Sequence, residues 1–331
     1  MITEIESNVK GTIKQSFYSK YVAFIGRNGS GKSSYVHSLE LALFSKAFDA
    51  SNKDVKQKKR LDMLATGGPV FASAQDSVYS TTHHMGSDTE YINAVKVAQD
   101  AMSGGTLALA RFICKYSSRA PRPNLDIEVA HPHWEEVSGK LGVIDALLAL
   151  EPVVNKSLRH YRDKLKETEV ATKYINHAPD KLALGAIMLE AKERAEACKQ
   201  AASDIKAGLT TIALELTDDT PMRFDIKRWI PDGMGEPVFH WDGTNFVLGF
   251  AGRPVPSGAE TVCLAVALAA ALLPWDKSIF IYPDRAYDSV TLGDIMRVAR
   301  TLPVAGVFIQ CISEPVNYDA ESLGWQMIQT S

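Results

Sequence analysis

The spacing of apolar and polar residues predicts alternating strands and helices at both ends of the chain. Near the start, the apolar run Tyr21–Ile25 predicts a strand, and apolar residues then recur at helical spacing up to Phe44. Short apolar runs in the last third predict strands at 222–226, 237–241, 246–250, 279–282 and 307–312. Helices are expected over the small apolar run Val262–Pro274 and at 291–301. Such alternation is typical of an α/β fold.

A helical segment separates these two regions. Apolar residues recur at helical spacing among many charges over 151–175 and again over 180–212, with turn-forming residues between them. The two stretches predict an antiparallel helical hairpin inserted into an α/β head. We therefore expect an N-terminal half at 1–135, a hairpin insertion at 136–215 and a C-terminal half at 216–331.

The segment between the first predicted strand and helix fits the pattern G-x-x-x-x-G-K-[S/T] at every fixed position. It reads Gly26-Arg27-Asn28-Gly29-Ser30-Gly31-Lys32-Ser33, and Ser34 follows it. In this pattern, backbone N–H groups turn toward phosphate oxygens, and the start of the helix adds unpaired donors and a favourable dipole. Lys32 is expected to reach the β- and γ-phosphates, and Ser33 to ligate Mg²⁺. The whole segment from Gly26 to Ser34 is therefore expected to bind ATP with Mg²⁺.

Net charge, cysteine spacing and the length of apolar runs limit the classes of protein to which the chain can belong. The net charge is −3, so no overall positive field indicates nucleic acid binding, and any such contact must come from local patches. The four cysteines lack CxxC spacing and are expected to be reduced thiols. The charged first residues do not match a signal peptide, and the longest apolar run is shorter than the roughly 20 residues of a membrane span. We expect a cytoplasmic protein, in its own cell or a host cell, with no membrane association.

A second candidate phosphate contact precedes the apolar helix. Pro256-Ser257-Gly258-Ala259-Glu260 resembles the LSGGQ-type signature of ABC ATPases, with alanine at the second glycine. In that family, the signature of one subunit contacts the γ-phosphate held by the other. The same residues also fit an ordinary helix start, in which Ser257 is the N-cap and Glu260 completes a capping box. A weaker local match to the signature lies upstream, at Met102-Ser103-Gly104-Gly105.

The phosphate loop, hairpin and signature follow one another as in ABC-type ATPase heads of the SMC/RecF group, which the chain resembles. Residues 58–68 add a basic, leucine-containing segment that ends in glycine. The resemblance implies that Arg60 lies against the nucleotide or DNA, and that Gln75 is the glutamine of a Q-loop. It also implies an ATP-dependent homodimer, or a heterodimer with a related head.

The chain departs from this family at the acidic strand. The family has Asp followed by Glu after this strand, whereas here Asp284 is followed by Arg285. Two registers remain open: either Asp284 is the acid on the Mg²⁺ side, or Asp288 fills the D-loop position and no acid occupies either catalytic place. The switch histidine is also absent, and Glu314 is a candidate substitute as catalytic base. We therefore predict slow or partner-stimulated ATP hydrolysis.

The resemblance indicates a function in DNA repair, recombination or genome maintenance and defence. DNA is a candidate partner through the basic segment Lys53–Arg60 and the cations of the first hairpin arm, although interleaved acids equally suit a solvated helix face. Those cations are Lys156, Arg159, Arg162, Lys164 and Lys166. An unidentified protein partner, such as a nuclease, is a further expectation. Two alternatives remain: a nucleotide-sensing interaction module without useful turnover, and a P-loop kinase of a small molecule.

Overall fold

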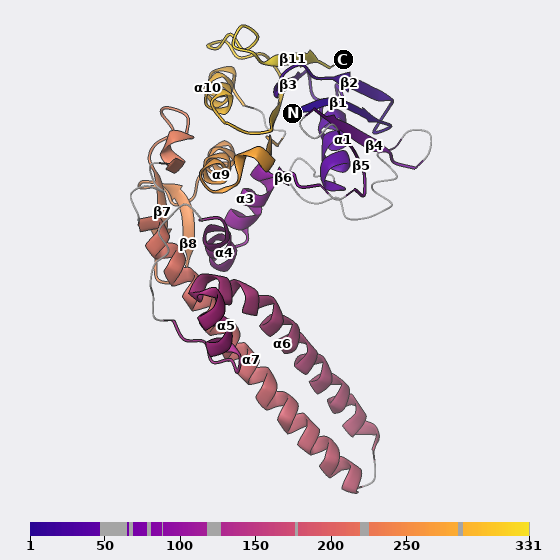
Figure 1. Cartoon of the computed structure of the whole chain (residues 1–331), viewed down its shortest axis with the longest axis vertical. Coiled ribbons are helices and arrows are strands. Elements are labelled where there is room, and N and C mark those ends of the chain that lie inside the picture. The colour runs from indigo at the N-terminus through magenta and orange to yellow at the C-terminus, as the bar shows by residue number, and fades with distance from the viewer. Residues whose placement is uncertain are drawn as a thin grey trace. The chain divides into compact units, whose positions relative to one another are not determined.

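The chain divides into two compact units, which are described separately. The computed structural model describes residues 1–46, 65, 69–77, 81–87, 89–117, 127–175, 178–218, 225–283 and 287–330. The first unit comprises Met1–Ser103, Pro221–Asp242 and Val247–Ser331, and the second comprises Gly104–Thr220 and Gly243–Phe246. Figure 1 shows the elements of both units.

A five-stranded parallel sheet forms the centre of the first unit. Its order is β11 (Gln326–Gln329), β3 (Tyr21–Ile25), β10 (Gly306–Cys311), β9 (Ser278–Ile281) and β6 (Ile92–Asn93). The side chains of β3, β9 and β10 are buried along their whole length. Such continuous apolar strands are typical of parallel sheets that are covered on both faces.

An antiparallel sheet of four strands lies in the same unit. Its order is β2 (Ile13–Ser16), β1 (Ile2–Ser7), β4 (Ala72–Asp76) and β5 (Thr81–His84). Helix α1 (Lys32–Phe44) packs against strands of both sheets, and its buried side chains lie around its circumference. A helix that is buried on several sides is expected when it packs between two layers. Its leucines join one apolar cluster with residues of β1, β3 and β10.

Three further helices accompany the parallel sheet: α3 (Ala94–Ser103), α9 (Gly258–Leu272) and α10 (Ser289–Arg300). Every residue of α9 from Val262 to Leu272 is buried, and α3 packs against both α9 and β9. A short 3₁₀ turn, η1 (Trp275–Lys277), leads from α9 into β9. The hairpin β7 (Pro237–Trp241) and β8 (Phe246–Phe250) precedes α9, as the sequence predicts.

The second unit contains the predicted helical hairpin. Its arms are α6 (Val143–Tyr174) and α7 (Ala178–Asp218), which run side by side in Figure 1 and pack with α4 (Thr106–Tyr116) and α5 (Trp134–Leu141). Gly208 allows close approach of the arms, because an added Cβ would lie 3.1 Å from Leu147 Cδ1. Within the described residues, these elements confirm the expected fold class: an α/β phosphate-loop fold with an inserted antiparallel hairpin.

The structure differs from the expected elements in two places. Both arms are longer than the periodic runs 151–175 and 180–212 on which they were predicted. The strand expected at 222–226 is wrong at 225 and 226, because residues 225–228 are helical, and residues 222–224 lie outside the described residues. Ile226, Trp229 and Ile230 are all buried, and their spacing places them on one side of a helical turn. In the part of the chain that the structure describes, no helix is long and apolar enough to cross a membrane.

Candidate nucleotide-binding site

The phosphate loop begins where three parallel strands end side by side. Ile25, the last residue of β3, pairs with Cys311 of β10 on one side and with Gln329 of β11 on the other. The backbone N–H of Gly26 donates to the carbonyl of Cys311 at 3.2 Å, and the N–H of Thr330 donates to the carbonyl of Ile25 at 2.7 Å. The loop therefore leaves the carboxyl edge of the sheet between two neighbouring strands, which is where open α/β sheets bind ligands.

Two glycines give the loop its curvature. Gly29 and Gly31 both have a φ of +89°, in the left-handed region that other residues rarely adopt. Gly31 is the N-cap of α1, and no side chain caps this helix start. The first N–H groups of a helix lack intrahelical acceptors, so an anion at this point would complete their hydrogen bonding and meet a favourable dipole.

Lys32 is buried inside the loop, with 3% of its surface exposed. Its ammonium group donates to the carbonyl of Gly26 at 2.7 Å and to the carbonyl of Arg27 at 3.1 Å. The loop thus surrounds its own lysine and holds a positive charge at the start of α1. Ser33 follows on the first turn, half-buried, whereas Asn28 is exposed on the loop. Ser34 is buried, and its carbonyl accepts from the Ser38 hydroxyl at 2.6 Å.

Ser257 and Glu260 form a complete capping box at the start of α9. The Ser257 N–H donates to Glu260 Oε2 at 2.8 Å, and the Ser257 hydroxyl accepts from the Glu260 N–H at 3.4 Å. Arg253 adds an ion pair to Glu260 Oε1 at 2.9 Å. The hydrogen bond from the Ser257 backbone lowers the pKa of Glu260 below its ordinary 4.5, although partial burial opposes this, and Arg253 adds to the lowering. The box stabilises the helix start and leaves Ser257 and Gly258 exposed.

The acidic strand shows where the sequence departs from the family pattern. β9 lies two strands from β3, with β10 between them, and it ends at Ile281. Asp284, the candidate Mg²⁺ acid, lies outside the described residues. Asp288 is the N-cap of α10, where its Oδ1 accepts from the N–H groups of Val290 and Thr291 at 3.1 and 2.9 Å. Hydrogen bonds from the Thr291 side chain and from these N–H groups lower the pKa of Asp288 below its ordinary 3.8.

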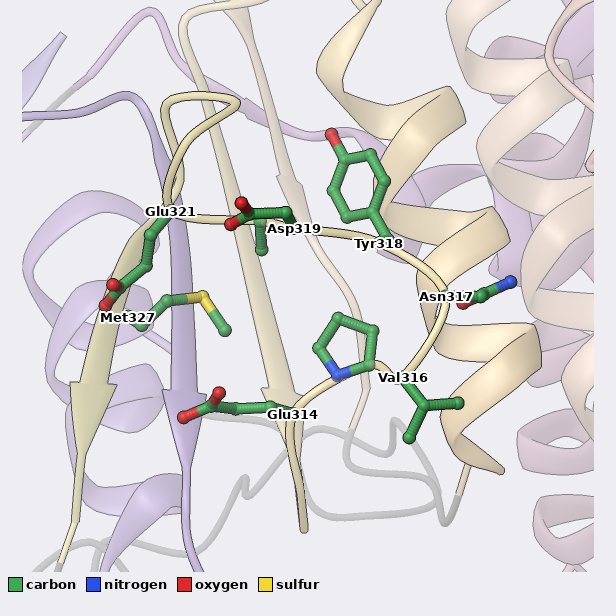
Figure 2. Close-up of a pocket in the computed structure, with 9 residues that line it drawn as sticks. Glu314, Val316, Asn317, Tyr318, Asp319, Glu321 and Met327 are labelled. Atoms are coloured by element: carbon green, nitrogen blue, oxygen red, sulfur yellow. The ribbon is translucent and has the colours of Figure 1, made fainter.

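Glu314 follows β10 at the same edge of the sheet as the phosphate loop. Its Oε1 accepts from Gln329 Nε2 at 3.0 Å, so the loop after β10 is tied to the end of β11. Glu314 also lines a cavity of 540 Å³, with Asp319 and Glu321 among the other lining residues. Figure 2 shows these carboxylates around the opening, together with Tyr318 and Met327. In the described residues, no cluster of three His, Cys, Asp or Glu side chains is arranged to hold a metal ion.

Of the remaining predicted site residues, the structure describes Gln75 and does not bring it to this edge. Gln75 is exposed on β4, within the antiparallel sheet, where it pairs with Glu4 and Thr82. Arg60 and the basic segment 53–60 lie outside the described residues. The upstream match to the signature contains Gly105, which precedes α4 with a φ of +80° and provides no side-chain cap.

One pair of residues at the loop was not predicted. The Ser30 hydroxyl lies 2.6 Å from the Thr330 hydroxyl, which belongs to a residue 300 positions away. No local pattern in the sequence could indicate this pairing, because Thr330 follows a short polar strand that carries no recognisable motif.

Comparisons with known proteins find similarity in structure. No protein-family model and no curated protein matches the chain. A structure of the recombination mediator protein RecF with ATP is similar over 95% of this chain and 92% of its own, with 11% identity and a TM-score of 0.43.

An Smc head domain from Pyrococcus furiosus, bound to the C-terminal domain of ScpA, is similar over 98% of this chain and 91% of its own, with 13% identity and a TM-score of 0.37. An Smc head domain from Pyrococcus yayanosii covers 93% and 92%, with 11% identity and a TM-score of 0.38. At these identities the similarity concerns the fold alone, and the chain is similar in fold to RecF and to Smc head domains.

Proposed function

We propose that this chain binds ATP with Mg²⁺ at the phosphate loop, and that ATP closes a dimer of this chain or of this chain with a related head. The observation that carries the proposal is the loop itself. It combines two left-handed glycines, a helix start without a side-chain cap, and a buried lysine that faces the loop interior. Together these groups complement the charge and the oxygen acceptors of a polyphosphate.

Each part of the loop would have a defined task. The N–H groups of Gly29, Gly31, Lys32 and Ser33 would donate to phosphate oxygens, whereas that of Ser30 already donates to the carbonyl of Arg27 at 3.1 Å. Lys32 would exchange its carbonyl acceptors for the β- and γ-phosphates. Mg²⁺ would neutralise phosphate charge, and the Ser33 hydroxyl is a suitable ligand because Mg²⁺ prefers oxygen donors. Asp284 is the second protein ligand that is proposed for Mg²⁺.

The start of α9 supports the proposal of a dimer. Ser257 and Gly258 are exposed at the N-terminus of a 15-residue helix, where N–H groups and dipole favour an anion. In the ABC family that the chain resembles, the phosphate at this position is held by the facing subunit, so we propose that here too it comes from a second molecule with its own bound ATP. Each composite site would then join the loop of one copy to Ser257 of the other.

ATP titration by calorimetry tests the binding step. Wild-type protein should bind ATP·Mg²⁺, and Lys32→Ala should weaken binding at least tenfold, whereas Lys14→Ala, on an exposed strand position, should not. Light scattering should then show dimers with ATP and monomers with ADP. Absence of binding by the wild-type protein would contradict the whole proposal.

We expect slow turnover, because the position after Asp284 holds Arg285 in place of the family's Glu, and Asp288 is occupied in capping α10. Loss of a water-positioning group generally lowers phosphoryl-transfer rates by orders of magnitude. A turnover above about 10 per second, which is the median for ordinary enzymes, would contradict this part of the proposal.

Contact with DNA is proposed for one face of α6. Four of its cations are exposed and make no ion pair with a described residue: Lys156, Arg159, Arg162 and Lys166. At about 100° of rotation per residue, they fall within about 120° of arc, on the side away from the buried Val154 and Thr168. Asp163 shares that arc and reduces its net charge.

A gel shift with duplex DNA at low salt tests this contact. The double variant Arg159→Ala/Arg162→Ala should bind DNA more weakly. The slope of log K against log salt concentration should become less negative by about 0.9 for each phosphate contact that is lost. Lys181→Ala, on the other arm, is the matched control. If the wild-type protein does not bind DNA, or if all variants bind it equally, the proposed DNA contact is wrong. The ATP-dependent dimer would then act without DNA.

A nucleotide-sensing module without useful turnover is the second candidate, and the departure at Arg285 favours it. Measuring ADP release with and without DNA distinguishes the two. Stimulated release supports a DNA-dependent ATPase, whereas a stable ATP dimer with no release supports the sensing module.

A further inference from the structure

We infer that Thr330 is a positioning residue for the phosphate loop, a role that rests on the proposed nucleotide binding. Thr330 directly follows β11 and makes three hydrogen bonds, two to the last residue of β3 and one to the loop. Its backbone N–H and its hydroxyl both donate to the carbonyl of Ile25, at 2.7 and 3.0 Å. Its hydroxyl oxygen also lies 2.6 Å from that of Ser30, in the middle of the loop.

The direction of the hydrogen bond between the two hydroxyls follows from counting protons. A hydroxyl has one proton to donate, and the Ile25 carbonyl can only accept. Because the Thr330 proton goes to Ile25, the proton between the two hydroxyls comes from Ser30. Thr330 therefore fixes the rotamer of Ser30 and ties the loop to the neighbouring strand.

Gly26 shows how closely these groups surround the start of the loop. A Cβ at Gly26 would lie 2.3 Å from Ser30 Oγ, 2.4 Å from Thr330 Oγ1 and 2.7 Å from the Thr330 carbonyl oxygen. The first glycine of the loop thus packs directly against the hydroxyl pair. Removing the pair would leave Gly26 and Ser30 without this support and allow the loop to adopt other conformations. A nucleotide would then have to order the loop as it binds, which weakens affinity.

Thr330→Val in the full chain is the primary test, because valine keeps the shape of threonine and removes its hydroxyl. The change removes both the hydrogen bond to Ile25 and the contact with Ser30, and it should weaken ATP and ADP binding alike by about fivefold to tenfold, within the range for neutral hydrogen bonds. Thr330→Ser should restore affinity to within about twofold of the wild-type protein, since it restores the hydroxyl. Thr301→Val is the matched control, because that hydroxyl donates to Val298 at an exposed helix end.

A double-mutant cycle identifies the partner. Ser30→Ala should also weaken nucleotide binding, and the loss in the double variant should be smaller than the sum of the two single losses, because both changes remove the contact between the two hydroxyls, although Thr330→Val also removes the hydrogen bond to Ile25. Ser30→Ala also reports on the pair if Thr330→Val fails to fold. Hydrogen exchange of the amides of residues 26–34, measured without nucleotide, should be faster in both single variants.

The outcomes separate this inference from the proposed function. Normal nucleotide affinity in Thr330→Val, or additive effects in the double variant, would overturn the positioning role and leave nucleotide binding intact. Failure of the wild-type protein to bind nucleotide would overturn both.

Discussion

The ammonium nitrogen of Lys32 lies 2.7 Å from the carbonyl oxygen of Gly26, so the lysine of the phosphate loop binds the first residue of that loop. The same ammonium contacts Arg27, and the side chain is almost fully buried. A buried charge is tolerated only when it is well hydrogen-bonded. The loop carbonyls therefore stabilise Lys32 before any phosphate arrives, and Lys32 in turn stabilises the folded loop.

This double role predicts that Lys32→Met lowers stability as well as nucleotide affinity. Methionine has a similar length but no donor, so the carbonyls of Gly26 and Arg27 would lose their partner inside the loop. We expect the free energy of unfolding to fall by about 1–3 kcal/mol in the absence of nucleotide. Urea denaturation measures it, and Lys14→Met, on an exposed strand position, is the control. An unchanged free energy of unfolding would show that water replaces the lost donor.

Glu314 is predicted to act on hydrolysis and not on binding. Glu314→Gln keeps the size of the side chain next to Gln329 but removes the carboxylate, which is the only part able to accept a proton from water. We expect single-turnover hydrolysis of bound ATP to slow by about a hundredfold or more, the range typical of general base catalysis, while ATP affinity stays unchanged. Glu321→Gln, in the same cavity, should leave the rate unchanged. Equal rates in all three proteins would exclude Glu314 as the base.

Ser257→Asp separates the capping role from the proposed contact with the partner's nucleotide. Asp caps helices about as well as Ser, so stability should change by less than about 0.5 kcal/mol. The added charge would repel the γ-phosphate of a facing subunit, so the ATP-dependent dimer should be lost in light scattering. Ser16→Asp, on the exposed strand β2, is the control. A dimer that persists in Ser257→Asp would indicate that Ser257 serves the helix alone.

The capping box also predicts a dependence of stability on pH. Hydrogen bonding from Ser257 lowers the pKa of Glu260 in the folded protein below 4.5, so the folded state binds its proton less readily than the unfolded chain does. The stabilisation is therefore complete above the unfolded pKa and is lost as the pH falls through the lower, folded pKa. The difference in melting temperature between wild-type protein and Glu260→Gln should be constant above about pH 6 and shrink below pH 4.5. A difference that grows on acidification would have the wrong sign.

Gly26→Ala should disrupt the loop because an added methyl group would overlap Ser30 and the backbone of Thr330. Overpacking of this kind costs about 1–3 kcal/mol of folding free energy, and nucleotide binding should be lost with the loop conformation. Gly185→Ala is the contrasting substitution, since Gly185 lies in α7 with no neighbouring atom within 4 Å of the added Cβ. That variant should be more stable by about 0.5–1 kcal/mol, because glycine is unfavourable in a helix interior. Thermal denaturation distinguishes the two.

Local patterns were sufficient to predict the strand, loop and helix from Tyr21 to Phe44. The spacing of the glycines indicates where the backbone turns, and the lysine indicates a positive charge at the start of the helix. The two strands of the hairpin β7–β8 were also predicted. The turn that joins them contains Gly243, whose φ in the structure is +90°. At 222–226, the short apolar run predicts a strand, but the helical spacing of Ile226, Trp229 and Ile230 extends past that run and fits the observed helical turn.

The partners of the phosphate loop could not be predicted. β11 is a short strand of polar and apolar residues that resembles many loops, and nothing local indicates that it pairs with β3. The roles of Thr330 and Gln329 depend on that long-range pairing, as does the hydrogen bond between Gln329 and Glu314. By contrast, the capping functions of Ser257 and Asp288 are local, and their residue types alone favour them.

The position of β3 between β10 and β11 has a consequence for biosynthesis. On the ribosome, the segment that ends in Ile25 is made before both of its neighbours in the sheet, which are translated roughly 300 residues later. Contacts between such distant segments form slowly. The nascent chain must therefore keep the apolar strand β3 without these partners until both segments have been made, and only then does the phosphate loop gain its neighbouring strands.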